Sequence, residues 1–155
     1  MPSHRQSRVI DHSAERLFDI VADVERYPEF LPLMRRATII ARDETGYQTE
    51  QTLVLGLMSQ RFRSRTILER PQRIIVISSD PPFRHFEVKW EFTPLGPTRC
   101  QVDFSLDCEA GSLLLIPFVQ MVVVPLGATM VAAFEGRANA LAASTITASG
   151  TGKSH

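Results

Sequence analysis

Polar and apolar residues alternate through the middle of the chain, from Ala37 to Asp107, and a period of two predicts β-strands. Short turns rich in Gly, Pro and Asp separate the alternating segments. Connections this short join antiparallel neighbours, because a parallel crossover needs about a dozen residues or more. We therefore predict one antiparallel meander with strands at Ala37–Arg42, Tyr47–Leu57, Gln60–Glu69, Ile74–Ser79, His85–Thr93 and Arg99–Asp107.

The segment before this meander predicts a short strand and a helix. The strand covers Gln6–Ile10, and Ser13 after it is a suitable N-cap for a helix whose apolar residues recur at helical spacing. Pro28 is expected to end this helix, since the residue before a proline avoids the helical conformation. A short apolar piece bracketed by prolines, Phe30–Met34, leads into the meander.

The segment after the meander, Ala110 to Phe134, contains no charged residue and predicts a long helix. About 20 apolar residues suffice to cross a bilayer. However, Pro117 and Pro125 interrupt the run and no Lys or Arg cluster flanks it. We therefore favour a bent helix that covers the apolar face of the sheet. Residues 1–143 then form a single domain, and the Ser-, Thr- and Gly-rich segment 144–155 is predicted to be a disordered tail.

This order of elements is that of an α+β helix-grip fold. In that fold a curved antiparallel sheet, here of about seven strands, wraps around a long C-terminal helix and tends to enclose a cavity. The alternation places the charges on one face of the sheet and an uncharged face toward the helix. Gln51, Ser64 and Thr66 are the polar side chains on that inward face, where they satisfy either the backbone or a ligand.

Composition narrows the class of function further. Basic and acidic residues number 17 each, so the net charge is zero and we expect no DNA partner. Cys100 and Cys108 lie eight residues apart on one predicted strand, about 26 Å, which is too far for a disulfide. The histidines form no metal-ligand spacing, and the N-terminus carries no secretory signal. We expect a cytoplasmic protein that needs no metal or cofactor.

Several motifs, taken in order, resemble the coenzyme Q-binding START-domain family, a branch of a polyketide cyclase-like superfamily that includes bacterial ribosome-association toxins. The family's signature after the first helix is similar to Tyr27-Pro28-Glu29-Phe30-Leu31-Pro32. The other matching stretches are Phe62-Arg63-Ser64-Arg65, Pro82-Phe83-Arg84, Trp90-Glu91-Phe92, Val102–Asp107 and Phe134–Ala138. The chain departs from the family at Leu33 and Met34, where Trp and Cys are common, and in its unusually apolar last helix.

The resemblance implies a START/Bet v 1-like fold and the non-catalytic binding of a ubiquinone-type polyprenyl lipid, in support of respiratory electron transport or quinone biosynthesis. It leaves open a ribosome-binding toxin that blocks subunit association, with the ribosome as partner, and a polyketide aromatase/cyclase. The cyclase is disfavoured, because no Asp, Glu, Lys, Arg or His is predicted on the inward face to move protons. We therefore expect no enzyme.

An apolar interior can bury a polyprenyl tail, although the same side chains can also be plain core packing. The predicted ligand-binding residues are Phe30, Leu31, Leu33, Gln51, Leu53, Leu55, Phe62, Ser64, Thr66, Val88, Trp90, Phe92, Phe104, Leu106, Phe118, Met121, Val122, Met130 and Phe134. Two apolar segments, Phe30–Met34 and Leu113–Phe118, are predicted to form matching lips that touch the inner face of the cytoplasmic membrane. The alternative for Phe30–Met34 is a plug at the end of the grip.

Overall fold

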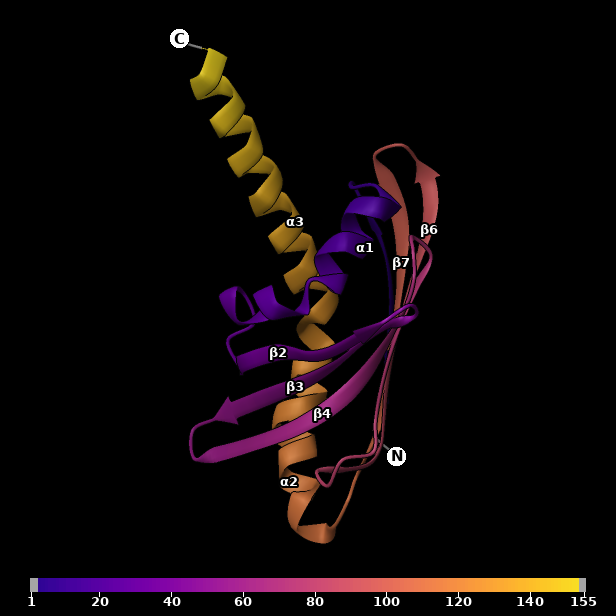
Figure 1. Cartoon of the computed structure of the whole chain (residues 1–155), viewed down its shortest axis with the longest axis vertical. Coiled ribbons are helices and arrows are strands. Elements are labelled where there is room, and N and C mark those ends of the chain that lie inside the picture. The colour runs from indigo at the N-terminus through magenta and orange to yellow at the C-terminus, as the bar shows by residue number, and fades with distance from the viewer. Residues whose placement is uncertain (1–2, 154–155) are drawn as a thin grey trace.

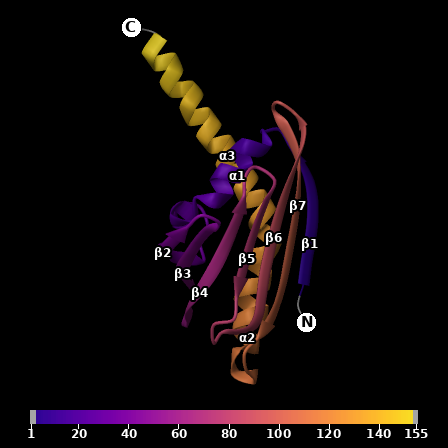
Figure 2. The same ribbon diagram turned by 45° about the vertical axis from the view of Figure 1, so that its right-hand side comes forward.

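The computed structural model describes the backbone of residues 3–153 and the side chains of residues 3–144. One antiparallel sheet of seven strands curves around a long C-terminal helix (Figure 1). The strand order is β1-β7-β6-β5-β4-β3-β2, so the first strand pairs with the last and the others pair with their neighbours in sequence. Figure 2 shows β1 beside β7 at one edge of the sheet. The predicted meander and its covering helix are confirmed.

The strands occur where the alternation predicts them, with ends displaced by up to three residues. Their bounds are β1 Ser3–Ile10, β2 Met34–Asp43, β3 Gly46–Leu55, β4 Met58–Glu69, β5 Arg73–Ser78, β6 Phe83–Gly96 and β7 Arg99–Ala110. The predicted end of β3 is wrong, because the strand ends at Leu55 and Gly56, with φ +58°, turns the chain toward β4. Leu55 and Leu57 therefore lie 37% and 105% exposed at this turn and do not extend the inward face.

Two short helices connect β1 to β2. Helix α1 (Ala14–Ala22) begins at the predicted cap, where the Ser13 hydroxyl accepts a hydrogen bond from the Arg16 amide at 3.1 Å. Its apolar stripe buries Leu17 against the sheet. The prediction that Pro28 ends this helix is wrong: α1 stops at Ala22, and Pro28 lies inside the following 3₁₀ helix, η1 (Val24–Glu29).

The apolar C-terminal run is helical from Leu113 onward, and its two prolines are accommodated differently. It consists of η2 (Leu113–Leu115), α2 (Ile116–Phe118), the π-helix η3 (Val119–Val123) and α3 (Val124–Lys153). Pro117 lies in the first turn of α2, where no backbone N–H is needed. Pro125 has no N–H to donate to the preceding turn, and the wider π-turn lies directly before it.

Helix α3 extends to Lys153 and so takes in most of the segment that the sequence predicts to be a disordered tail; residues 154 and 155 lie outside the described part of the chain. Among the described residues, one helical stretch, Leu113–Ser144, is long and apolar enough to cross a membrane by length and composition. In this fold it packs on the sheet through side chains no more than 3% exposed, among them Phe118, Val122 and Phe134.

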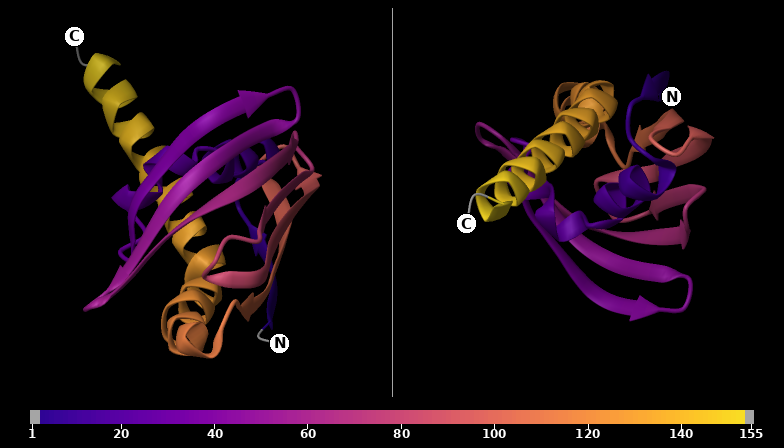
Figure 3. Two further views of the ribbon diagram at one scale, coloured as in Figure 1. Left: turned by 60° about the horizontal axis from the view of Figure 1, so that its bottom comes forward. Right: turned by 90° about the horizontal axis from the view of Figure 1, so that it is seen from above.

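The helix approaches the sheet closely at one point. A Cβ on Gly127 would lie 2.5 Å from Cδ2 of Leu106 on β7, so a residue without a side chain is what lets the two elements meet there. Further along α3, the Phe134 ring meets the Trp90 ring edge to face at 5.1 Å. Seen from above in Figure 3, the sheet curves around the helix and leaves a concave interior.

Candidate functional site

An apolar cavity lies between the concave face of the sheet and the middle of the C-terminal helix. Its volume is about 80 Å³, or about 580 Å³ when the unoccupied space of its open mouth is included. All the sheet strands except β1 contribute to its wall, together with η1, η3 and α3. The lining residues are Tyr27, Met34, Gln51, Leu53, Phe62, Val76, Phe86, Val88, Trp90, Phe104, Leu106, Val123, Leu126, Gly127 and Met130.

The structure brings many of the predicted ligand-binding residues to this cavity. Those that line it are Gln51, Leu53, Phe62, Val88, Trp90, Phe104, Leu106 and Met130. A second group is buried or half-buried in the surrounding core without lining the cavity: Phe30, Leu31, Leu33, Ser64, Thr66, Phe92, Phe118, Val122 and Phe134. For both groups, a role in ligand binding stays a prediction.

Two predicted residues do not face the interior. Leu55 is exposed at the β3–β4 turn, for the reason given above. Met121 is 55% exposed because the π-helix turns Val119, Val122 and Val123 toward the sheet and leaves Met121 on the opposite side. The sequence assigns the helix phase by an ordinary α-helical repeat, and a π-turn shifts that phase. Three further lining residues of the helix were not predicted from the sequence: Val123, Leu126 and Gly127.

The expectation of two matching exposed lips is half right. Leu113 and Leu114 are 83% and 91% exposed, as predicted. The other segment, Phe30–Met34, is largely covered: Leu31 and Met34 are 1% and 7% exposed. Phe30 packs on Phe134 at 5.1 Å, about five helical turns beyond the start of α2, so the two segments do not lie side by side.

The buried polar side chains of the described residues form a polar strip on the inner face of β3 and β4: Thr49, Gln51, Ser64 and Thr66. The Ser64 hydroxyl donates to Oε1 of Gln51 at 2.9 Å. Thr66 hydrogen-bonds to the Tyr47 hydroxyl. Thr49 lies two residues before Gln51 on β3, so both side chains point to the same face. This alternation would have predicted the inward position of Thr49 from the sequence.

The cavity lining has little capacity for proton transfer. Of its described residues only Tyr27 carries a titratable side chain, and its hydroxyl donates to the Val21 carbonyl. Burial raises the pKa of Tyr27 well above its usual value. The phenol therefore stays protonated near neutral pH, and the other described side chains of the lining are not titratable.

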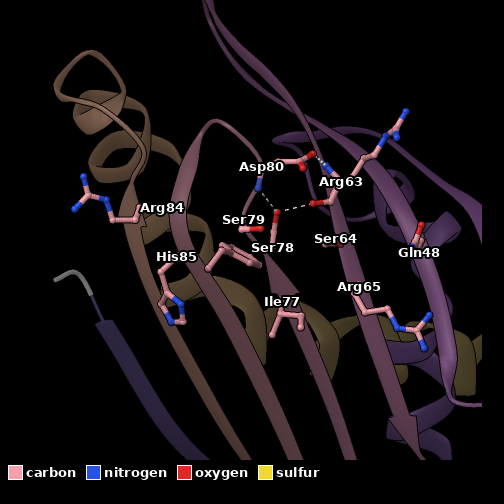
Figure 4. Close-up of a pocket in the computed structure, with 11 residues that line it drawn as sticks. Gln48, Arg63, Ser64, Arg65, Ile77, Ser78, Ser79, Asp80, Arg84 and His85 are labelled. Carbon is pink, nitrogen blue, oxygen red and sulfur yellow. Dashed lines mark hydrogen bonds between the residues drawn. The ribbon is translucent and has the colours of Figure 1, made fainter.

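A second hollow, of about 570 Å³ where the same measure gives 80 Å³ for the inner cavity, lies on the outer face of the sheet (Figure 4). It forms where β4 and β5 part, and there Ser78 and Asp80 replace strand pairing by hydrogen-bonding the backbone of Arg63. Figure 4 shows Arg63 and Arg84 pointing away from each other at its two sides. Both guanidinium groups pair with glutamates, 3.5 and 3.7 Å away. This outer hollow is a solvated polar surface and not an enclosed site.

The sulfur chemistry and metal chemistry of the described residues are simple. Cys100 and Cys108 are buried and free, as predicted. Burial raises the pKa of the Cys108 thiol to about 11, which keeps it protonated and unreactive. Within the described chain, no group of three or more His, Cys, Asp or Glu side chains could hold a metal ion.

A curved antiparallel sheet that grips a long helix around an apolar cavity defines the helix-grip class, the START and Bet v 1-like domains. The chain belongs to the polyketide cyclase / dehydrase and lipid transport family, whose model matches residues 10–135. Its fold is shared by a START superfamily protein from Mycobacterium smegmatis, which is 24% identical with a TM-score of 0.75 over 90% of this chain and 98% of that one.

Two relatives have names that indicate different functions. The ribosome association toxin RatA of Pseudomonas aeruginosa is 32% identical over 142 residues, which cover 91% of this chain and 99% of the relative. The mitochondrial coenzyme Q-binding protein COQ10 homolog B of Xenopus laevis is 28% identical over 139 residues, which cover 87% of this chain and 57% of the relative. The predicted resemblance to this family is confirmed.

Proposed function

We propose that this protein binds a ubiquinone-type polyprenyl lipid without catalysis, with its apolar part in the cavity, in support of respiratory electron transport or quinone biosynthesis. The observation that carries the proposal is the cavity wall, whose side chains are apolar apart from the Tyr27 hydroxyl, the Gln51 amide and the indole N–H of Trp90. Burial of apolar ligand surface contributes about 25 cal/mol per Å². The relative named as a coenzyme Q-binding protein supports the same class of ligand.

The size of the cavity sets a requirement on uptake. Its enclosed 80 Å³ is smaller than an ordinary ligand pocket of about 300–1,000 Å³, so side chains must move to admit a ring and tail. Met34 and Met130 line the cavity, and unbranched thioether side chains change shape at low cost. We expect the lipid to enlarge the cavity at these two residues and to leave through its open mouth.

The proposal includes peripheral contact with the inner face of the cytoplasmic membrane, in a protein that is otherwise cytoplasmic. The exposed side chains Leu113, Leu114 and Ile116, called here the apolar tip, support it. In Figures 1 and 2 the β3–β4 turn, which carries the exposed Leu57, lies toward the same end of the molecule as α2. An apolar end of this kind suits a protein that withdraws a lipid from a bilayer.

Transfer from vesicles tests the lipid proposal. Lipid-free protein is incubated with vesicles that contain a polyprenyl quinone, separated by gel filtration and extracted with organic solvent. We expect a quinone-to-protein ratio near one. Protein that emerges without quinone, while a known quinone-binding protein acquires it in parallel, would rule the proposal out.

Association with the ribosome is the second candidate, and the RatA relative is the specific observation that favours it. Arginines of β4 on the outer face, such as the 73% exposed Arg61, could contact ribosomal RNA. Overproduction followed by sucrose-gradient sedimentation separates the two candidates. Fewer joined ribosomes would support this second function, and this effect should weaken in an Arg61→Glu/Arg63→Glu variant. Unaltered ribosome profiles would remove it.

A further inference from the structure

We infer that the segment Val24–Leu33 between α1 and β2, called here the strap, is the movable wall of the cavity. Arg137 of α3 latches it through Glu29 and Phe30, and release of this latch sets the rates at which the ligand enters and leaves. The inference rests on the proposed lipid binding and deepens it, because it concerns access to the same cavity.

The strap is the part of the cavity wall that can move with the smallest loss of hydrogen bonds. Of the lining residues, only Tyr27 lies outside the sheet strands and the last helix. The strands are held by their ladders, and α3 is held against the sheet at Gly127 and Phe134. Within the strap the hydrogen bonds are local, such as that from the Phe30 amide to the Tyr27 carbonyl at 3.1 Å, and a 3₁₀ turn has poorer hydrogen-bond geometry than an α-helix.

Two of the motifs found in the sequence, Tyr27–Pro32 and Phe134–Ala138, meet at this strap. Arg137 donates to the Glu29 carboxylate at 2.9 Å, although the two residues are 108 positions apart in the chain. Its guanidinium group also lies over the Phe30 ring, 5.1 Å from the ring centre. The Arg137 side chain is only 19% exposed, so water screens this pair less than it screens the ion pairs on the outer face of the sheet. One arginine thus holds two consecutive residues of the strap on the helix.

The latch closes the strap over the flexible side of the cavity. The Phe134 ring packs edge to face on both Tyr27 and Phe30, with ring centres 5.1 Å apart in each case. Met130 lies about one helical turn before Phe134, and Met34 directly follows the strap. These are the two methionines at which we expect the cavity to enlarge. We therefore expect the strap to part from α3 when a ligand enters.

A latch of this kind changes rates more than affinity. The pair of Glu29 and Arg137 is closed both in the empty protein and after the ligand has entered, so its free energy cancels from the binding equilibrium. It opposes only the open state through which the ligand passes in either direction. An ion pair and a cation–π contact together change such an opening equilibrium by about tenfold, equivalent to about 1.4 kcal/mol. Their removal should therefore speed uptake and release alike.

Stopped-flow fluorescence of Trp90, the single tryptophan of the chain and part of the cavity wall, measures both rates. The full-length protein is mixed with a short-chain ubiquinone to follow uptake, and the loaded protein is mixed with empty lipid vesicles to follow release. Arg137→Gln and Glu29→Gln each break the latch, and Arg137→Lys keeps the charge. Arg8→Gln is the control, because it breaks the 2.8 Å pair with Glu135, which joins α3 to β1 and not to the strap.

Arg137→Gln is expected to raise both rates about tenfold and to leave the dissociation constant unchanged. Glu29→Gln, which keeps the contact of Arg137 with Phe30, should raise both rates by less, while Arg137→Lys and Arg8→Gln should stay close to wild type.

Unchanged rates in Arg137→Gln and Glu29→Gln, or equal acceleration in Arg8→Gln, overturn the latch while lipid binding stands. Faster release without faster uptake overturns it too, because Arg137 would then act on the bound state alone. If Arg137→Gln does not fold, Glu29→Gln decides the matter from the strap side. A ubiquinone that leaves the Trp90 fluorescence of wild type unchanged overturns the proposed function as well.

Discussion

At the scale of single residues, two tyrosines hold the wall of the cavity to the first helix. The Tyr27 hydroxyl donates to the Val21 carbonyl and the Tyr47 hydroxyl to the Ala22 carbonyl, so they satisfy carbonyls that α1 leaves free at its C-terminus. They are the only tyrosines of the chain, and burial raises the pKa of both above 10. The attachment of the C-terminus of α1 to Tyr27 and Tyr47 therefore depends on both phenols remaining protonated.

This predicts a loss of stability in alkali. A phenol whose pKa is higher in the folded than in the unfolded state stabilises the fold fully below the unfolded value, about 10, and loses that contribution as pH rises toward the folded value. We expect the free energy of unfolding to fall by about 1.4 kcal/mol per pH unit for each tyrosine above pH 10. Urea unfolding at a series of pH values measures it.

The double variant Tyr27→Phe/Tyr47→Phe is the control for that measurement. It should be less stable than wild type near pH 8, by about 1 kcal/mol for each lost hydrogen bond, and the difference should narrow above pH 10. If the two proteins lose stability in parallel through this range, the neutral phenols do not have the role assigned to them.

At the scale of elements, the C-terminal helix determines how much space remains inside the grip. Gly127 lets it approach Leu106, and the π-turn before Pro125 sets which side chains face the sheet. Helix α3 meets the sheet at Gly127 and at the aromatic contact of Phe134 with Trp90. Met130 lies between these two contacts along the helix and lines the cavity.

Filling the cavity from the helix should abolish lipid binding without unfolding the protein. Gly127→Leu places a side chain in the cavity wall, where overpacking costs about 1–3 kcal/mol and the removal of a helical glycine recovers up to about 1 kcal/mol. We expect quinone taken up from vesicles to fall at least tenfold, measured after gel filtration. Gly136→Ala on the same helix meets open space and should keep full uptake.

The exposed apolar tip makes a separate prediction. Leu113→Glu/Leu114→Glu replaces two exposed leucines of η2 with charges, and we expect binding to lipid vesicles, measured by flotation, to weaken at least tenfold. Val9→Glu/Leu95→Glu introduces the same charges at two other exposed apolar sites, on β1 and near the β6–β7 turn, and should have no effect. Equal weakening by both pairs would mean that membrane contact is not localised to the tip.

At the scale of the whole molecule, the sequence predicted the sheet, its covering helix and the uncharged inward face, because strand parity is a local property. It did not predict the end of β3 at Gly56, since one left-handed glycine decides it. It left open whether Leu31 is exposed in a lip or buried in a plug, and it did not predict the outward position of Met121. These positions depend on the π-turn in the C-terminal helix and on how the connecting segments pack. The volume of the cavity depends on all of these tertiary features together.

The central claim is that this interior holds a lipid, and native mass spectrometry of the protein purified from a quinone-producing bacterial host tests it most directly. The account predicts a fraction of the protein carrying the added mass of one polyprenyl quinone, and loss of that fraction in Gly127→Leu but not in Gly136→Ala. Protein that carries no lipid, and gains none when purified quinone is supplied, would contradict it.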